Sequence, residues 1–186
     1  DAVTGFERDY GIPEGATMLL PNIEFARGLV QLGAIVRVSP RVTACLMAAE
    51  DLAADLGAER EPDGFELAYA RQRFLLECVA AGVVAVDCPY TFSDVAGVER
   101  ETRWARRLGY KAKSTVDPSH PAIINEVMTP NAAELTRARA IVTAFEAARE
   151  RGEARVEVDG ALVEVPTYTT AKRLLARHDE LQGWTI

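Results

Sequence analysis

Three short apolar runs that end in acidic residues place the strongest constraint on how this chain can fold. They cover residues 18–23, 44–48 and 83–87, and they end at or just before Glu24, Glu50-Asp51 and Asp87. An apolar run of this length between turn signals predicts a buried strand. A fourth strand is expected over residues 110–116. Segments with a helical pattern separate these runs, so the sequence predicts parallel strands joined by helical crossovers, which is an α/β fold.

The predicted helices between these strands cover residues 25–32, 65–81 and 95–108. We expect the second of them to bury an apolar stripe and to end at Gly82, which would serve as its C-cap. The stripe consists of Phe65, Ala68, Leu75, Leu76 and Val79.

The pattern changes after Pro118. Asn131 and Glu134 form the capping signature of a helix, and Asp159-Gly160 is a strong signal for a hairpin turn. The elements expected in this part are a short helix over residues 119–128, a long helix from residue 131, a hairpin over residues 154–165 and a last helix over residues 167–181.

Length, charge and cysteine content exclude several classes of protein. The 186 residues can bury a sizeable core, and the net charge of −7 argues against nucleic-acid binding, which needs a basic surface. No apolar stretch approaches the ~20 residues of a membrane span and no signal peptide is visible, so we expect a cytoplasmic protein without a membrane partner. Cys45, Cys78 and Cys88 lack metal-type spacing and are expected to be buried thiols.

Glu24 and Asp51 are candidate ligands of one Mg²⁺ ion. A carboxylate at the C-terminal end of a strand lies where α/β folds keep their chemistry, and these two are one βα unit apart. Mg²⁺ takes one or two carboxylates and completes its shell with water and substrate oxygens. The alternative is that each acid caps the helix that follows it. The sequence has neither a G-x-G-x-x-G nor a Walker-type loop, so a dinucleotide site or a P-loop is not supported.

Five segments carry a resemblance to a known family. They are LLPNIEFARG (19–28), AAEDLAADLGAE (48–59), residues 69–113, DPSHPAIINEVMTPNAAEL (117–135) and VDGALVEVP (158–166). In this order and spacing the chain resembles the C-terminal part of the HpcH/HpaI aldolase and citrate lyase β-subunit family. The likeness is greatest to its acyl-CoA lyases of the malyl-, citramalyl- and citryl-CoA types.

The resemblance implies a (β/α)8 TIM barrel of the phosphoenolpyruvate/pyruvate type. Residues 1–130 would supply about the second half of that barrel, strands five to eight, and residues 131–186 a helix–hairpin–helix lid. The chain opens on Asp1 without Met, and we expect it to be part of a longer protein. A naturally shortened relative is the alternative.

The family's site residues fall on matching positions of this sequence. Glu24 and Asp51 match its Mg²⁺ ligands. Asp87 matches an acid that could contact substrate as a catalytic residue, although a structural role is as open. Lys113 matches a family lysine and is our candidate for contact with the cofactor portion of the substrate. The family's His-Pro is replaced by Asp-Pro, and the nearby His120 is expected to be a solvated loop residue.

Glu164 takes the place of a family Asp in the DGxxxxxP hairpin. That acid is expected to reach the active site of a neighbouring subunit and to move a proton there, which would require a homo-oligomer, a dimer or a trimer. The alternative is the polar face of a strand.

A group of basic side chains lies on and after the helix over residues 95–108. The default interpretation is a solvated face that pairs with Glu99 and Glu101, and a contact with coenzyme A phosphates is the alternative. The basic residues are Arg100, Arg103, Arg106, Arg107 and Lys111.

The resemblance implies that the protein is a Mg²⁺-dependent carbon–carbon lyase. It would cleave or form a 3-hydroxyacyl-CoA thioester, with a 2-oxo acid and acetyl-CoA or a homologue as the other partners, so that coenzyme A enters as part of the substrate. Two alternatives are a pyruvate-type class II aldolase acting on free hydroxy-oxo acids and a non-catalytic half-barrel with an interaction or regulatory role.

Overall fold

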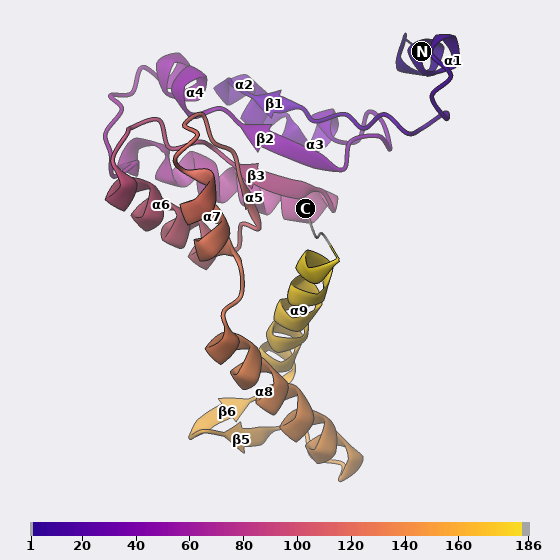
Figure 1. Ribbon diagram of the computed structural model, residues 1–186, viewed down its shortest axis with the longest axis vertical. Helices are drawn as coiled ribbons and strands as arrows, with labels where there is room; N and C mark the ends of the chain where they lie inside the picture. Colours follow the sequence, from indigo (N-terminus) through magenta and orange to yellow (C-terminus); the bar gives the residue numbers. More distant parts are fainter. Residues whose placement is uncertain (1, 184–186) are drawn as a thin grey trace. The chain divides into compact units, whose positions relative to one another are not determined.

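The computed structural model describes residues 2–183 and divides between Met128 and Thr129 into two compact units. The first unit contains a four-stranded parallel sheet in the order β1-β2-β3-β4 (Figure 1). Its strands are β1 (Asn22–Ile23), β2 (Ala44–Met47), β3 (Val84–Asp87) and β4 (Ala112–Lys113). Helical crossovers join them, so the predicted α/β fold with a parallel sheet is confirmed.

The two outer strands are shorter than the sequence predicts. β1 and β4 have two residues each. In the first run Leu19 makes only an isolated bridge to Val42, and Pro21 follows it. Proline has no N–H to donate to a ladder, which limits regular pairing before Asn22.

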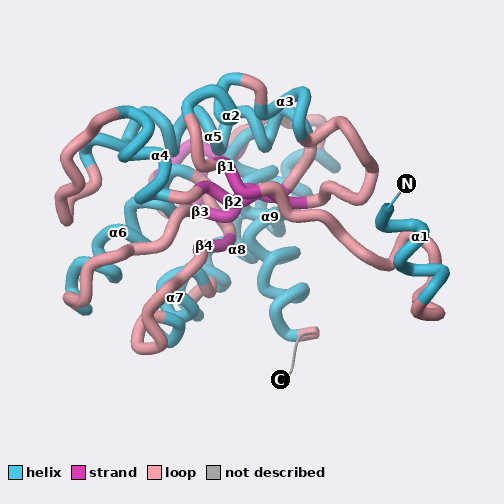
Figure 2. The backbone as a smooth tube through the Cα atoms, turned by 90° about the horizontal axis from the view of Figure 1, so that it is seen from above, coloured by secondary structure: helices cyan, strands magenta, loops and turns pink. Residues whose placement is uncertain are grey.

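The helices of the first unit lie before, between and after the strands, and those of the crossovers cover one side of the sheet. They are α1 (Ala2–Asp9), α2 (Ala26–Val30), α3 (Leu32–Ile35), α4 (Ala49–Leu56), α5 (Ala68–Ala81), α6 (Val95–Leu108) and α7 (Pro121–Met128), with a 3-10 turn η1 (Phe65–Leu67) before α5. In Figure 2 helices α2, α3 and α5 lie together beside the strands.

The two faces of the sheet differ in burial. Cys45, Met47 and Ala85 belong to the main core together with apolar side chains of the helices. On the other face Val84 keeps 51% of its surface exposed, and its register partner Ala44 is half-buried. The main core therefore lies between the sheet and its helices. The predicted half-barrel stays a prediction.

Helix α5 buries a different face from the predicted one. Phe65, Leu76 and Val79 are 82%, 68% and 66% exposed, so the predicted stripe is wrong for these three residues, whereas Leu75 packs against the main core. The buried side chains of α5 are Ala70, Arg71, Phe74 and Cys78. The face includes Arg71 because two acids neutralise that side chain inside the unit, and an apolar pattern cannot anticipate a buried arginine. The three cysteines are buried free thiols, as predicted.

The second unit is a helix–hairpin–helix. It consists of α8 (Ala132–Glu150), β5 (Val156–Val158), β6 (Ala161–Val163) and α9 (Val165–Gln182). Asn131 and Glu134 form the predicted capping box at the start of α8. The predicted hairpin is confirmed, since Asp159 and Gly160 have φ of 50° and 74° and both central residues of a type I′ turn need positive φ.

Candidate functional site

Glu24 and Asp51 follow the adjacent parallel strands β1 and β2. Ile23 and Met47 are partners in the register of these strands, so Glu24 comes directly after the end of β1. Asp51 lies in the first turn of α4, which begins right after β2. The carboxyl ends of parallel neighbours lie at one edge of a sheet, and the two acids therefore lie at the same edge.

A third acid fixes the relation between the two segments. The backbone N–H of Ala26 donates to Asp55 Oδ2 over 2.8 Å, which holds the start of α2 against α4. Asp51 precedes Asp55 by four residues in α4 and so shares its helix face. Asp51 is thus on the side of α4 that meets the segment carrying Glu24. Sequence reasoning missed Asp55, because nothing in the pattern distinguishes it from a surface acid.

Neither acid caps a helix. The N-cap residues of α2 and α4 are Phe25 and Ala48, and neither makes a side-chain capping hydrogen bond. The first amide of α2 donates to Asp55, not to Glu24 or Asp51. Glu24 Oε1 accepts a 2.7 Å hydrogen bond from Asn22 Nδ2. Asp51 is exposed, and its side chain makes no hydrogen bond or ion pair with any residue between 2 and 183. The capping alternative is therefore not what the structure shows.

The acids fit Mg²⁺ by their chemistry. Carboxylate oxygens are the hard ligands that Mg²⁺ prefers, and the ion usually keeps several waters instead of occupying an all-protein cage. Within residues 2–183 no three or more His, Cys, Asp or Glu side chains gather to hold a metal. A pair of carboxylates is enough for Mg²⁺, which leaves its other positions for water and substrate oxygens.

Glu50, next to Asp51, is held by side chains from other segments. Its carboxylate accepts hydrogen bonds from the Thr91 hydroxyl (2.5 Å) and from Arg60 Nε (3.0 Å). Partial burial opposes its ionisation, but these two donors outweigh burial and lower the pKa of Glu50. The first turn of α4 thus carries one tethered acid and one free acid.

Asp87 and Lys113 belong to a buried ion cluster, which consists of Arg71, Asp87, Glu101 and Lys113. Arg71 donates to both oxygens of Asp87 (2.9 and 2.7 Å) and to Glu101 (2.9 Å). Lys113 Nζ donates to Asp87 (2.9 Å), to Glu101 (2.9 Å) and to the carbonyl of Cys88 (2.5 Å). Burial would raise the pKa of Asp87, but Lys113 and Arg71 outweigh it and hold that pKa below its usual value.

The ion cluster uses its hydrogen-bonding groups internally. An ammonium has three N–H donors, and those of Lys113 have three acceptors. The side chain of Asp87 is fully buried, and both of its oxygens accept from Arg71. Asp87 and Lys113 are also register partners on β3 and β4, so they share the helix-covered face of the sheet.

Glu101 corrects one prediction about the basic helix. It does not pair with the arginines of its own helix but lies buried, 6% exposed, in the ion cluster. The predicted pair of Glu99 with Arg103 is present at 2.7 Å on the surface. The two acids differ because Glu101 lies on the buried face of α6 and Glu99 does not.

His120 corrects a second prediction. The imidazole is fully buried, not solvated. Neither ring nitrogen has a hydrogen-bond partner within residues 2–183, and Nε2 lies 3.9 Å from Asp117 Oδ2. The ring lies near Tyr90, with 6.0 Å between centroids. Helix α7 starts at Pro121 and packs against α6, which removes this turn from solvent.

Glu164 lies in the second unit, at the corner between β6 and α9. It is exposed and is the N-cap residue of α9, but its side chain makes no capping hydrogen bond. Its carboxylate has no hydrogen bond or ion pair to the described residues. The side chain is therefore available at the surface of this unit.

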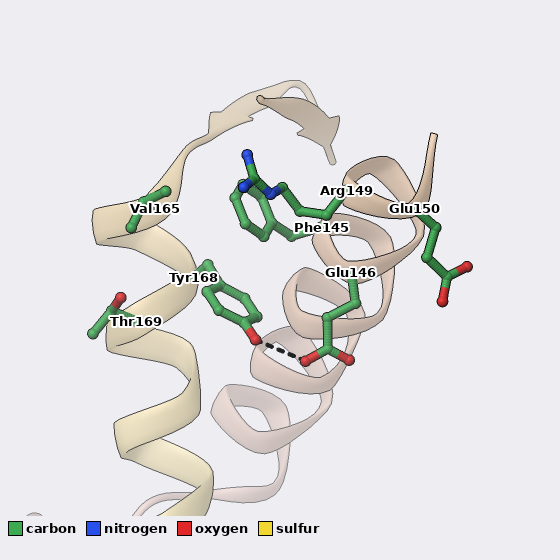
Figure 3. Close-up of a pocket in the computed structure, with 7 residues that line it drawn as sticks. All are labelled: Phe145, Glu146, Arg149, Glu150, Val165, Tyr168 and Thr169. Atoms are coloured by element: carbon green, nitrogen blue, oxygen red, sulfur yellow. Dashed lines mark hydrogen bonds between the residues drawn. The ribbon is translucent and has the colours of Figure 1, made fainter. Parts of the chain in front are cut away.

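A pocket of about 530 Å³ lies beside this corner, between α8 and α9. Figure 3 shows the Tyr168 hydroxyl donating to Glu146, over 2.8 Å. The lining residues are Phe145, Glu146, Arg149, Glu150, Val165, Tyr168 and Thr169. Because acids and an arginine both line it, charge alone does not select an ionic ligand here.

Comparison with known proteins assigns the family. The model of the HpcH/HpaI aldolase/citrate lyase family matches residues 2–118. The chain belongs to this family. The resemblance drawn from the five sequence segments is thus confirmed, and the match covers the sheet with its candidate metal ligands. Within residues 2–183 no helix is long and apolar enough to cross a membrane.

Three relatives define the similarity further. Citrate lyase subunit beta of Leuconostoc mesenteroides subsp. cremoris is 33% identical over 93% of this chain and 58% of its own length. The (3S)-malyl-CoA thioesterase of Cereibacter sphaeroides is 31% identical over 92% of this chain and 62% of its length. The crystal structure of CitE from Mycobacterium tuberculosis in complex with magnesium, acetoacetate and coenzyme A has 27% identity and a TM-score of 0.70, covering 87% of this chain and 60% of that chain. The chain thus spans about three fifths of the length of these proteins.

Proposed function

We propose that this chain carries the metal-binding part of a Mg²⁺-dependent carbon–carbon lyase. The reaction is cleavage of a 3-hydroxyacyl-CoA thioester to a 2-oxo acid and acetyl-CoA or a homologue, or the reverse condensation. The observation that carries the proposal is a pair of acids, Glu24 and Asp51, at the carboxyl ends of adjacent parallel strands. Neither of them pairs with a cation in the described part of the chain. Membership of a lyase-containing family supports it, as does a related structure that holds magnesium, acetoacetate and coenzyme A.

The residues of the first unit have different proposed roles. Glu24 and Asp51 would hold the ion, and Asn22 orients Glu24 by donating to one of its carboxylate oxygens. Bound Mg²⁺ supplies polarisation of the carboxylate and keto oxygens of the 2-oxo acid. For Asp87 and Lys113 we infer a positioning role, because their contacts are internal to the ion cluster. They hold the ends of β3 and β4 together, where Ser114 also donates to the Asp87 carbonyl.

Glu164 is proposed as the proton-transfer group, supplied to the site of a second copy in a dimer or trimer. Its free carboxylate at a surface corner supports this role. A carboxyl at hydrogen-bond reach of the thioester α-carbon accepts or delivers the proton there. In the cleavage direction a base takes the hydroxyl proton, the carbon–carbon bond breaks to a thioester enolate, and an acid protonates that enolate.

The test is Glu164→Gln in the complete protein, assayed with malyl-, citramalyl- and citryl-CoA and Mg²⁺ by release of the 2-oxo acid. We expect turnover to fall about 10²-fold or more, the usual contribution of a general acid or base, with Mg²⁺ affinity unchanged. Glu157→Gln, on the same hairpin and also exposed, is the matched control and should keep full activity. Full activity of Glu164→Gln would reject the assignment.

Thioester hydrolysis is the second candidate, because one relative with 31% identity is a (3S)-malyl-CoA thioesterase. The two reactions differ in their products. Hydrolysis of malyl-CoA releases malate and free coenzyme A, whereas the lyase releases glyoxylate and acetyl-CoA. Product analysis of the same assay separates them, and free coenzyme A as the main product would favour the thioesterase.

A further inference from the structure

Arg60 joins three segments at the carboxyl edge of the sheet. Its Nε donates to Glu50 over 3.0 Å, and Nη1 donates to Glu66 in η1. Its Nη2 lies 3.5 Å from Thr91 Oγ1, and the guanidinium lies over the ring of Phe92 with 5.7 Å to the centroid. The side chain is 13% exposed although it belongs to the loop between α4 and η1.

Thr91 closes this arrangement. Its hydroxyl donates to the same Glu50 oxygen that accepts from Arg60, over 2.5 Å. Arg60 and Thr91 therefore hold Glu50 from two sides, one from the loop after α4 and one from the loop after β3. We call Glu50, Arg60 and Thr91 the Glu50 clasp.

The first turn of α4 depends on side-chain anchors outside the helix. Its N-cap is Ala48, which provides no capping hydrogen bond, and an uncapped N-terminus leaves its first amides without partners. Ala49 and Leu52 pack this turn into the core. The Glu50 clasp is the polar anchor of the same turn, one residue from Asp51.

We propose that Arg60 is a positioning residue for the metal site, acting through the Glu50 clasp to hold Asp51 in place. The proposal rests on the proposed function, since it takes Asp51 as a ligand of Mg²⁺. Arg60 does not touch the ion. It fixes the turn of α4 from which Asp51 projects, in the way that outer hydrogen bonds orient metal ligands in other sites.

Electrostatics and positioning make opposite predictions for the loss of Arg60. Removing the Arg60 cation leaves the negative charge of Glu50 unpaired next to the proposed metal site. Because the site is then more negative, it should attract Mg²⁺ more strongly. Loss of the anchor instead lets Asp51 move, which weakens binding. The sign of the change in Mg²⁺ affinity therefore distinguishes a positioning role from a charge effect.

The experiment measures Mg²⁺ affinity by titration calorimetry and amide hydrogen exchange in α4 for four forms of the chain. These forms are the unsubstituted chain, Arg60→Met, Thr91→Val and Arg103→Met. Thr91→Val keeps both charges of the clasp and removes only the hydroxyl. If Arg60→Met does not fold, Thr91→Val still tests the proposal. Arg103→Met removes an arginine from a surface ion pair and is the control.

We expect Arg60→Met to weaken Mg²⁺ binding about tenfold, the scale found when outer partners of metal ligands are lost. Exchange in α4 should rise, Thr91→Val should show a smaller loss of the same sign, and Arg103→Met should match the unsubstituted chain. Unchanged or tighter binding by Arg60→Met and Thr91→Val would overturn the positioning role alone. Absence of Mg²⁺ binding by the unsubstituted chain would overturn the proposed metal site together with this proposal.

Discussion

The carboxyl edge of the parallel sheet carries two sets of acids in opposite surroundings. Asp51, after β2, is exposed and Glu24, after β1, is half-buried, and neither pairs with a cation among residues 2–183. Asp87 and Glu101, at β3 and α6, are buried and share two cations with which they form the ion cluster. All three strands end in or beside a carboxylate, yet only the first set is open to a ligand.

The difference shows that the position of an acid at a strand end does not decide its role. A carboxylate is available to a metal when its face of the sheet is open and its charge is not already compensated. Burial with two cations instead makes a carboxylate part of the scaffold, because leaving such a charge unpaired is costly. Substitutions in the two sets should therefore change different quantities. Those in the ion cluster should lower the free energy of unfolding, and those of Glu24 and Asp51 should lower Mg²⁺ affinity.

The largest expected effect is on folding, from Asp87→Asn. This substitution leaves Arg71 and Lys113 buried with one acid between them, and breaking a buried pair typically costs about 3–5 kcal/mol. Urea unfolding at neutral pH measures the loss. Glu99→Gln, which breaks an exposed pair with Arg103, should cost less than about 1 kcal/mol. Equal losses for the two variants would remove the distinction between cluster and surface.

The pH dependence of stability provides a second test of the ion cluster. The folded-state pKa of Asp87 lies below its ordinary value, so the unfolded chain binds this proton first as the pH falls. The contribution of Asp87 is fully present above about pH 4, the unfolded value, and is lost as the pH falls through the folded pKa. The unfolding free energies of the unsubstituted chain and Asp87→Asn should differ by a constant amount from neutral pH down to about pH 4 and approach each other below it. A difference that stays constant as the pH falls well below about 4 would contradict the ionised state of Asp87.

The open set should respond in metal affinity. Asp51→Asn removes a charged ligand, so we expect Mg²⁺ affinity to fall by more than about tenfold, or 1.4 kcal/mol. The unfolding free energy should change by less than about 0.5 kcal/mol, as for surface substitutions away from special features. Calorimetric titration and urea unfolding of the same sample measure both quantities. A large loss of stability with intact Mg²⁺ binding would place Asp51 in the scaffold.

The smallest expected effect comes from Asn22→Ala. It removes the hydrogen bond that orients Glu24 and leaves both proposed ligands in place. A single hydrogen bond contributes about 0.5–1.5 kcal/mol, so Mg²⁺ affinity should fall about two- to tenfold. No change in affinity would show that Glu24 needs no partner to bind the ion.

Local patterns predicted part of this structure well. The Asn131 capping box and the Asp159-Gly160 turn are set by neighbours in the sequence, and both are present. The strand-end placement of Glu24 and Asp51 likewise followed from the apolar runs that precede them. These features require only short-range chemistry.

The rest depends on contacts between distant segments. Arg71 is buried because Asp87 and Glu101 lie 16 and 30 residues away in the chain, and no periodicity marks such a pairing. His120 is buried because α7 packs against α6. The sequence around His120 is typical of a loop and does not predict this packing. The Glu50 clasp joins residues 41 positions apart. The pattern of α6 predicts a solvated Glu101 for the same reason, since its partners Arg71 and Lys113 lie on other elements.

The most direct test of the central claim is anomalous diffraction from crystals of the chain with Mn²⁺ in place of Mg²⁺. Mn²⁺ accepts the same carboxylate and water ligands, and its anomalous signal locates the ion independently of any assumption about the site. The account predicts a peak at the carboxyl edge of β1 and β2, bound by carboxylate oxygens of Glu24 and Asp51. A metal bound without either of these side chains, or at the ion cluster, would contradict it.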